Sequence, residues 1–386
     1  MEKKKREANL ELLRILSMCM VIGLHYLGKG NALKDMAEIL PGNPNYINEV
    51  LAWYLEALCY GAVNLYIMIS GYFLINSTVR FEKLSKLIIQ VFFYSAGIYL
   101  IIRLLGYYPK EWEDGYHKSI MILPISLQHY WFASVYAAFY MLAPFLAVAL
   151  RKLKKKEHFG VLLILLFLFM RFLKLFSYHL IPLNDDGMGI IWMITVFVLA
   201  AYIRRFVPIK AKRRFLYLAA GVLSLLATAA GSFLVAFLYQ KTGKLDGYID
   251  FLFAYNSPTV VVGSTFLFLF FRTVRIPDGF VSKTITAVSP LTFGVYLLHD
   301  HFLLRDLWVK IWKVDRIFET PYFVLHFIAV VLTVFIICAL AEWIRNLVFG
   351  LIYKIKPVRT LFHLIGKADV IFPKPDDNFE EAKAES

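Results

Sequence analysis

The sequence predicts an all-α protein, a polytopic membrane helix bundle of about ten transmembrane helices with both termini cytoplasmic. Hydrophobic residues make up 59% of the 386 residues, and charged residues only 18%. A soluble domain carries about 25% charged residues. The apolar residues also fall into long blocks, and basic residues gather in alternate connections between these blocks. Together these three observations indicate a chain that crosses a membrane many times.

Each apolar block is close to the ~20 residues that a helix needs to cross a hydrocarbon core. We predict one transmembrane domain over residues 1–353 and a partly disordered cytoplasmic tail over residues 354–386. The predicted helices cover residues 9–28, 51–75, 84–106, 129–150, 159–180, 190–206, 214–238, 249–272, 286–305 and 321–349.

Charge alternates between the predicted connections. One set of connections is basic and includes residues 3–6, 151–156 and 204–214, whereas the other holds acids such as Asp35 and Asp246. Because cytoplasmic loops carry the excess of Lys and Arg, the basic set is assigned to the cytoplasm. An even number of helices then places both termini inside, and we expect a multi-pass protein of the cell (plasma) membrane.

The composition also argues against other classes of protein. The formal net charge is +14, but the basic residues lie at the ends of apolar blocks, as membrane topology requires, so we predict no nucleic-acid partner. The three cysteines lie inside apolar blocks, which is typical of small core residues and not of a disulfide set. The N-terminal apolar run contains ionisable residues, so it is interpreted as a retained helix and not as a signal peptide.

The first predicted helix carries a guanidinium and an imidazole, on Arg14 and His25, eleven positions apart. At about 100° per residue, this spacing puts both side chains on one face, about 16 Å apart along the axis. Ionisable side chains inside a span face a cavity or a partner. We therefore expect one polar channel that is basic at its inner mouth and has an imidazole deeper in.

That layout suits a donor substrate that is an anion on a long arm, such as an acyl-CoA. Arg14 would hold the anionic end by bidentate contacts. His25 would act as a general base toward an acceptor hydroxyl, or would itself be acylated transiently. A hydrogen-bonded structural histidine is the alternative interpretation of His25.

Five further polar or aromatic residues are candidates for supporting or substrate-binding roles. Asn64 and Ser70 lie in the second helix, where Ser70-Gly71 equally suits close helix packing. Trp131 suits an interfacial aromatic belt as well as a binding site. His299, at about the depth of His25, would share one site with it, although no ligand spacing indicates a metal. Glu342 would pair either with Arg14 or with Arg345 on its own helix.

Five segments, in this order along the chain, resemble the acyltransferase 3 family, integral-membrane O-acyltransferases that decorate bacterial envelope glycans. They are "LELLRILSMCMVIGLH", "VNLYIMISGYFL", "YWFASVY", "FGVYLLH" and "LAEW", and the likeness extends from residue 8 to about residue 350. The resemblance implies an acyl-CoA donor substrate, by default acetyl-CoA, with no bound cofactor. It also implies an acceptor on the outer side, a cell-envelope polysaccharide or glycolipid.

By this resemblance His25 is the leading catalytic residue and Arg14 its essential companion. Ser70, Trp131 and His299 fall at family motif positions, as does Glu342. The chain departs from the family at two positions: Asn64 stands where many members have Asp, and Ile344 stands where many have the Pro of a Glu-x-Pro motif.

A transporter or exporter of a small anionic solute or acyl group is the alternative function, because a ten-helix bundle with internal charges suits it too. The sequence shows no inverted repeat and no Gly/Pro-broken helices in matching positions, which argues against transport. A scaffold without chemistry leaves the Arg14–His25 pairing unexplained. The acceptor, the acyl chain and the oligomeric state are not indicated by any pattern.

Overall fold

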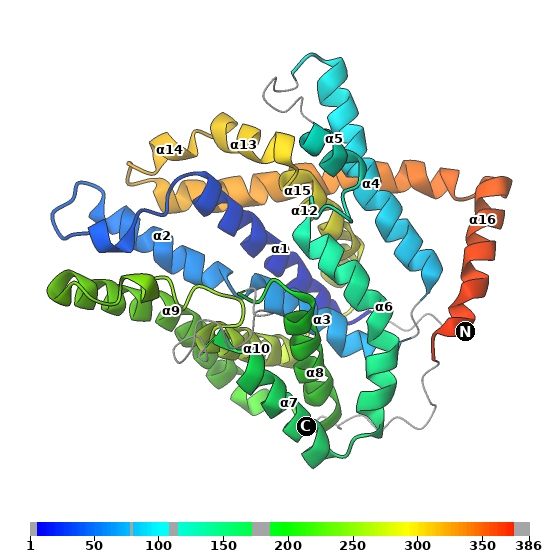
Figure 1. Cartoon of the computed structure of the whole chain (residues 1–386), viewed down its shortest axis with the longest axis horizontal. Coiled ribbons are helices and arrows are strands. Elements are labelled where there is room, and N and C mark those ends of the chain that lie inside the picture. The colour runs from blue at the N-terminus through cyan, green and yellow to red at the C-terminus, as the bar shows by residue number, and fades with distance from the viewer. Residues whose placement is uncertain (1–5, 78–79, 108–114, 172–185, 374–386) are drawn as a thin grey trace.

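The computed structural model describes residues 6–77, 80–107, 115–171 and 186–373, and all regular structure within them is helical (Figure 1). Seven helical segments in these residues are long and apolar enough to cross a membrane. They are Ala8–Lys29, Tyr46–Leu74, Phe81–Leu104, Trp131–Lys152, Ala211–Thr242, Phe280–His299 and Phe323–Ile352. The chain is therefore an all-α multi-pass membrane protein, as predicted.

Seven spans are identified by length where the sequence predicts about ten. The apolar helix Pro258–Thr273 has 16 residues, and the helices in the predicted regions 159–180 and 190–206 have 15 and 17 residues. All three are shorter than the ~20 residues of a full span. The rest of the region 159–180, from residue 172 on, lies outside the described residues.

The α-helices lie close to the predicted blocks. Their bounds are α1 Ala8–Lys29, α2 Tyr46–Cys59, α3 Ala62–Leu74, α4 Phe81–Leu104, α5 Gly115–Ile122, α6 Trp131–Lys152, α7 Lys155–Phe169, α8 Ile190–Phe206, α9 Arg214–Thr242, α10 Pro258–Thr273, α11 Phe280–Val288, α12 Thr292–His299, α13 Phe302–Ile311, α14 Val314–Ile317, α15 Phe323–Ile352 and α16 Lys356–Lys367.

The first helix, α1, lies in the middle of the bundle. It contacts α2, α3, α12 and α15, and Figure 1 shows it between α15 and the α9–α10 pair. Leu10, Leu13 and Ile22 are almost completely buried. Gly23 allows the Phe327 ring to approach, because a Cβ here would overlap that ring. Arg14 and His25 therefore lie on a helix that other helices surround.

Two helices that were predicted as continuous are interrupted. The predicted block 51–75 is divided into α2 and α3 at Tyr60 and Gly61, and the block 286–305 into α11 and α12 by a 3-10 turn over Ser289–Leu291. Pro290 lies inside this turn, and proline has no N–H for an α-helical hydrogen bond. Hydropathy does not detect such breaks, because the residues around them stay apolar.

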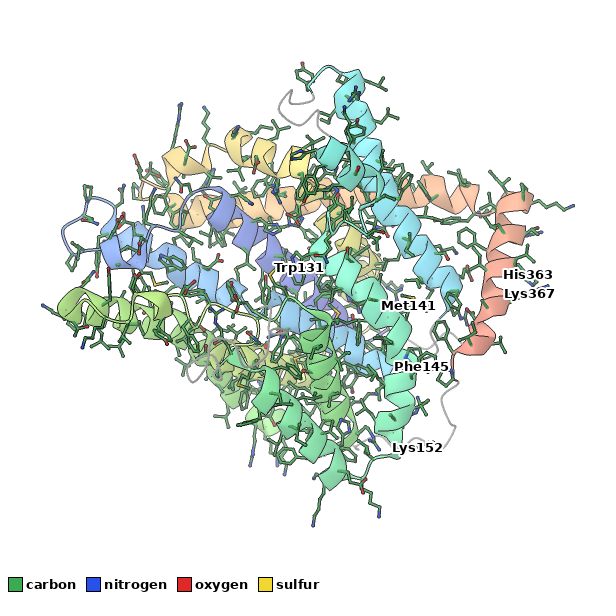
Figure 2. The ribbon with its side chains drawn as sticks, in the orientation of Figure 1. Trp131, Met141, Phe145, Lys152, His363 and Lys367 are labelled. Atoms are coloured by element: carbon green, nitrogen blue, oxygen red, sulfur yellow. The ribbon has the colours of Figure 1, made fainter. Side chains whose placement is uncertain are left out.

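Two further helices, α6 and α16, carry residues that are used below. In α6, Trp131 and Lys152 lie at opposite ends of the helix (Figure 2). Within the predicted tail, α16 contacts α4 and buries Phe362 edge-on against Tyr353, with ring centroids 5.1 Å apart. His363, on the same helix, is exposed (Figure 2).

Candidate active site

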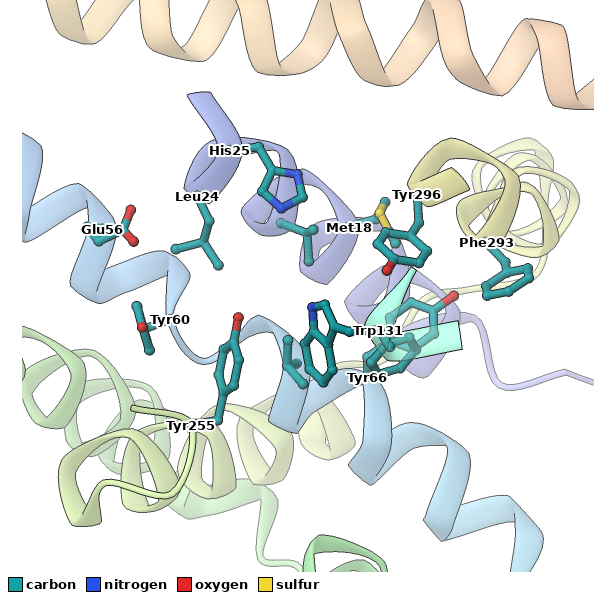
Figure 3. Close-up of a pocket in the computed structure, with 13 residues that line it drawn as sticks. Met18, Leu24, His25, Glu56, Tyr60, Tyr66, Trp131, Tyr255, Phe293 and Tyr296 are labelled. Carbon is teal, nitrogen blue, oxygen red and sulfur yellow. The ribbon is translucent and has the colours of Figure 1, made fainter. Parts of the chain in front are cut away.

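A cavity of about 210 Å³ lies between α1, the α2–α3 break, α6 and α12 (Figure 3). His25 and Glu56 contribute an imidazole and a carboxylate to its lining. The other polar groups of the lining belong to aromatic rings, and the rest of the wall is aliphatic. The aromatic residues are Tyr60, Tyr66, Trp131, Phe132, Tyr255, Phe293 and Tyr296. Binding sites for small molecules commonly combine such an apolar wall with a few placed polar groups.

His25 is hydrogen-bonded to His299, which the α12 helix brings to the same depth. The Nδ1 atom of His25 lies 3.0 Å from the Nε2 atom of His299. The Nδ1 atom of His299 lies 2.7 Å from the carbonyl oxygen of Val295. A carbonyl oxygen only accepts, so a neutral His299 carries its proton on Nδ1 and presents a bare Nε2.

The same reasoning fixes the tautomer of His25. Because the bare Nε2 of His299 accepts, Nδ1 of His25 is the donor, and the lone pair of His25 is on its own Nε2. His25 lines the cavity, where this lone pair is free to accept a proton. A general base needs such an atom within reach of the proton it removes.

A carboxylate that the sequence analysis did not select lies beside the histidine pair. Oδ1 of Asp300 lies 3.7 Å from Nδ1 of His25 and 3.9 Å from Nη1 of Arg305. A carboxylate at this position stabilises the positive charge that His25 acquires on taking a proton. The signal in the sequence was the run His299-Asp300-His301, three ionisable residues together after an apolar helix.

The C-terminal end of α12 is held in place by two hydrogen bonds. Tyr130 donates its hydroxyl to the carbonyl of Leu297 at 2.9 Å, and Trp308 donates its indole N–H to the carbonyl of His299 at 3.0 Å. These bonds satisfy carbonyl groups that the end of a helix leaves without partners. The position of His299 is therefore set by Tyr130, the residue before α6, and by α13 as well as by α12.

Arg14 lines a second cavity, of about 300 Å³, together with Ser70, Lys83 and Tyr136. Its Nη1 atom donates to Oε2 of Glu11 at 2.8 Å. Ser289, in the turn between α11 and α12, donates to the same carboxylate. The cavity thus combines two cations, and Arg14 is oriented by its own helix.

The two cavities are separated, which corrects the expectation of a single channel along α1. The wall consists of aromatic side chains: Tyr66 and Phe132 line the first cavity, and Tyr136 lines the second. The Phe132 ring contacts both tyrosines, with a centroid distance of 5.8 Å to each. Ser70 hydrogen-bonds the Tyr136 phenol from the side of Arg14. Helical spacing put Arg14 and His25 on one face, but it carried no information on which bulky residues of α3 and α6 pack between them.

Asn64 and Trp131 have different relations to the first cavity. Asn64 is fully buried and donates to the carbonyl of Tyr255 at 2.7 Å, while Trp192 donates to its side-chain oxygen at 3.0 Å. Asn64 does not line the cavity, but it holds the backbone of Tyr255, whose ring does. Trp131 lines the cavity itself and stacks on the Tyr255 ring at 6.0 Å.

Glu342 lies outside the lining of both cavities. Its carboxylate accepts two hydrogen bonds from Arg345, at 2.7 and 2.8 Å, and one from the Tyr94 hydroxyl at 2.6 Å. Of the two alternatives for Glu342, the structure contains the pair with Arg345, and Arg14 pairs with Glu11 instead. Within the described ranges, no group of three or more His, Cys, Asp or Glu side chains could hold a metal ion.

The fold and the site define a class of protein: a multi-pass membrane enzyme with a partly buried imidazole pair and two adjoining cavities. A family model described as an acyltransferase domain, Acyl_transf_3, matches residues 7–343. The chain belongs to this family and is a membrane acyltransferase. Searches of curated proteins and of solved structures found no match.

Proposed function

We propose that the chain is an O-acyltransferase that moves an acyl group, by default acetyl, from cytoplasmic acyl-CoA to a hydroxyl of a cell-envelope polysaccharide or glycolipid. The observation that carries this proposal is the His25–His299 pair, which leaves the Nε2 lone pair of His25 at the first cavity. Membership of the acyltransferase family supports the reaction class.

The donor binds at the second cavity. Arg14 and Lys83 there provide cations for the phosphate groups of CoA. The thin acyl-bearing arm extends from this cavity toward His25, which lies about 16 Å further along α1. The rings of Tyr66, Phe132 and Tyr136 have to change rotamer to let it pass, because they close the direct path.

The transfer step follows from the tautomer of His25. Nε2 removes the proton of an acceptor hydroxyl group, and the hydroxyl oxygen attacks the carbonyl carbon of the thioester. The carbon–sulfur bond breaks, and the proton passes from His25 to the departing CoA thiolate, so that an ester and free CoA result. In the alternative route Nε2 attacks the thioester itself, releases CoA and then passes the acyl group to the acceptor. In both routes Asp300 stabilises the positive imidazole ring.

The positive-inside rule supports an orientation in the plasma membrane with both termini cytoplasmic. Arg14 lies near the first turns of α1, and His25 near its last turn. In this orientation the donor cavity faces the cytoplasm, and the His25 cavity lies nearer the outer surface, where envelope glycans are found.

A transporter remains the second candidate, on one observation. The structure contains two interrupted helices, at Gly61 and at Pro290, and interrupted helices build many transport sites. The two breaks lie in the second and ninth predicted helices, which do not correspond in a five-plus-five repeat. Uptake or efflux of an anion without acyl-CoA would favour this candidate.

The test uses membranes that contain the full chain and acetyl-CoA labelled in the acetyl group. Wild-type protein should transfer label to envelope polymers, and mass spectrometry of these polymers with and without the gene should locate the ester. His25→Ala should reduce transfer by about 100-fold or more, because both routes need Nε2. His363→Ala, on the exposed side of α16, is the matched control. Full transfer by His25→Ala would contradict the proposal.

A further inference from the structure

Glu56 places a carboxylate in the cavity of His25, and the transfer mechanism does not use it. Glu56 lies on the last turn of α2, just before the break at Tyr60 (Figure 3). Its exposed fraction is 8%. Oε2 of Glu56 has no hydrogen-bond partner in the part of the chain that the structure describes. An isolated buried carboxylate is costly, and native proteins rarely retain one without a partner or a function.

Other charged side chains of this region have partners of their own. The cation Arg171 pairs with Asp186 at 3.0 Å, and Asp300 lies beside His25. Glu56 is thus available to a molecule that enters the cavity.

A row of aromatic rings continues from Glu56 along the same wall. Tyr60 follows one turn later on the chain, and its ring lies 5.2 Å from the ring of Tyr255. Tyr255 in turn stacks on Trp131 with an interplanar angle of 21°. Figure 3 shows Glu56 and Tyr60 at one side of the cavity, Tyr255 and Trp131 below, and His25 above. The wall therefore offers flat apolar faces with a carboxyl group at one end.

We propose that Glu56, Tyr60, Tyr255 and Trp131 form the acceptor subsite, and that this subsite takes a single polyhydroxylated ring, a sugar residue. This inference deepens the proposed function and rests on it. Glu56 accepts a hydrogen bond from one hydroxyl of the ring, while His25 deprotonates another. The aromatic faces pack against the C–H faces of the ring.

The chemistry of the groups favours this ligand over a simple alcohol. A carboxyl oxygen accepts hydrogen bonds from hydroxyl groups, and a protonated carboxyl group also donates one, so Glu56 can pair with a ring hydroxyl in either form. A simple alcohol has no second hydroxyl to satisfy Glu56. A site that is built to bind a substrate hydroxyl discriminates strongly against analogues that lack it. The cavity of about 210 Å³ lies below the range of about 300–1,000 Å³ found for drug-sized ligands, which suits one ring at a time.

The experiment uses the purified full chain in lipid nanodiscs with acetyl-CoA. The probes are methyl β-D-glucopyranoside, its monodeoxy derivatives, methyl β-D-glucosaminide and cyclohexylmethanol. Acetylated product is measured by mass spectrometry, and released CoA by a thiol assay. The ratio of the two separates transfer to the probe from transfer to water. CoA release also shows that a variant is folded and active.

We expect wild-type protein to give a higher ratio of acetylated product to released CoA with the glucoside than with cyclohexylmethanol. Glu56→Ala should lower the glucoside ratio by about tenfold, since a hydrogen bond between the cavity wall and the ring is lost. Glu56→Gln keeps a side-chain oxygen and should lower it less. One of the deoxy derivatives should give the same low ratio with wild type and Glu56→Ala, which identifies the hydroxyl that Glu56 binds. Glu49→Gln, on the same helix and outside the cavity lining, should leave every ratio unchanged.

Three outcomes would overturn the inference while leaving acyl transfer intact. They are equal ratios for the glucoside in wild type and Glu56→Ala, equal use of glucoside and cyclohexylmethanol by wild type, and a preference for the glucosaminide that both Glu56 variants abolish. The last would mean that Glu56 binds an ammonium group. Absence of any CoA release by wild-type protein would instead overturn the proposed function and this inference with it.

Discussion

His25 and His299 meet at 3.0 Å although 274 positions separate them in the chain. The contact joins the central helix α1 to the end of the short helix α12. His299 is itself held by the Val295 carbonyl, so a series of two hydrogen bonds determines which nitrogen of His25 is bare. His299 is thus a positioning residue: it controls the tautomer of the residue that faces the cavity.

Replacing His299 should lower turnover more than donor binding. In His299→Ala, Nδ1 of His25 loses its acceptor, and the ring can flip or carry its proton on Nε2, where it cannot act as a base. Removal of such orienting partners typically costs about 10–100-fold in metal sites, and we expect a fall in kcat of that size with the KM for acyl-CoA nearly unchanged. His299→Gln, whose side-chain oxygen can accept from Nδ1, should retain more activity.

The measurement is steady-state CoA release with purified protein, with kcat and KM determined separately. His363→Gln serves as the control, because His363 is exposed on α16. An unchanged kcat in His299→Ala, or a rise in KM alone, would refute the positioning role of His299.

Arg14 should act on the donor and not on the chemical step. It lines the cavity of Ser70 and Lys83, apart from His25. In Arg14→Ala we expect the KM for acyl-CoA to rise about 10–100-fold, the value of one or two charge-assisted hydrogen bonds. Arg14→Lys should recover only part of this loss, because a lysine cannot make the bidentate contact.

The control for Arg14 is Glu11→Gln, which frees the guanidinium without removing it. This variant should leave kcat within a few-fold of wild type. If Arg14→Ala lowered kcat and left KM unaltered, the assignment of the second cavity to the donor would be wrong.

Periodicity and depth were sufficient to predict the helical class, most helix positions and the common level of His25 and His299. They were insufficient for features that depend on how side chains of different helices pack together. The aromatic wall of Tyr66, Phe132 and Tyr136 depends on three side chains from two helices, and no spacing in the sequence relates them. The role of Asn64 behind Tyr255 depends on a loop contact 191 positions away. The breaks at Gly61 and Pro290 are visible in the sequence as residue types, but the hydropathy around them is that of a continuous span.

Glu342 and Arg345 should behave as a structural pair. Both side chains are buried and doubly hydrogen-bonded to each other. Removing one partner of a buried pair leaves a charge without compensation and typically costs about 3–5 kcal/mol. Glu342→Met alone should therefore lower the free energy of unfolding by about that amount.

The double variant Glu342→Met/Arg345→Met distinguishes a structural role from a functional one. Replacing both partners by apolar residues is often close to neutral, although the Tyr94 hydroxyl then loses its acceptor, so the double variant should recover part of the stability and most of the acyl transfer. Thermal unfolding in detergent and CoA release are the two measurements. A stable double variant without activity would show that Glu342 takes part in the reaction.

Gly294 has to be a glycine because the carboxyl group of Glu342 occupies the place of its side chain. A Cβ on Gly294 would overlap that carboxyl group. Gly294→Ala should therefore displace Glu342 or α12, at a cost of about 1–3 kcal/mol as for other overpacked sites. Because His299 ends the same helix five residues later, kcat should fall together with the unfolding temperature.

Gly97→Ala in α4, where a Cβ meets nothing within 4 Å, is the control and should not destabilise the protein. An alanine at position 294 with unchanged stability and turnover would mean that α12 adjusts freely, and that its register does not set the position of His299.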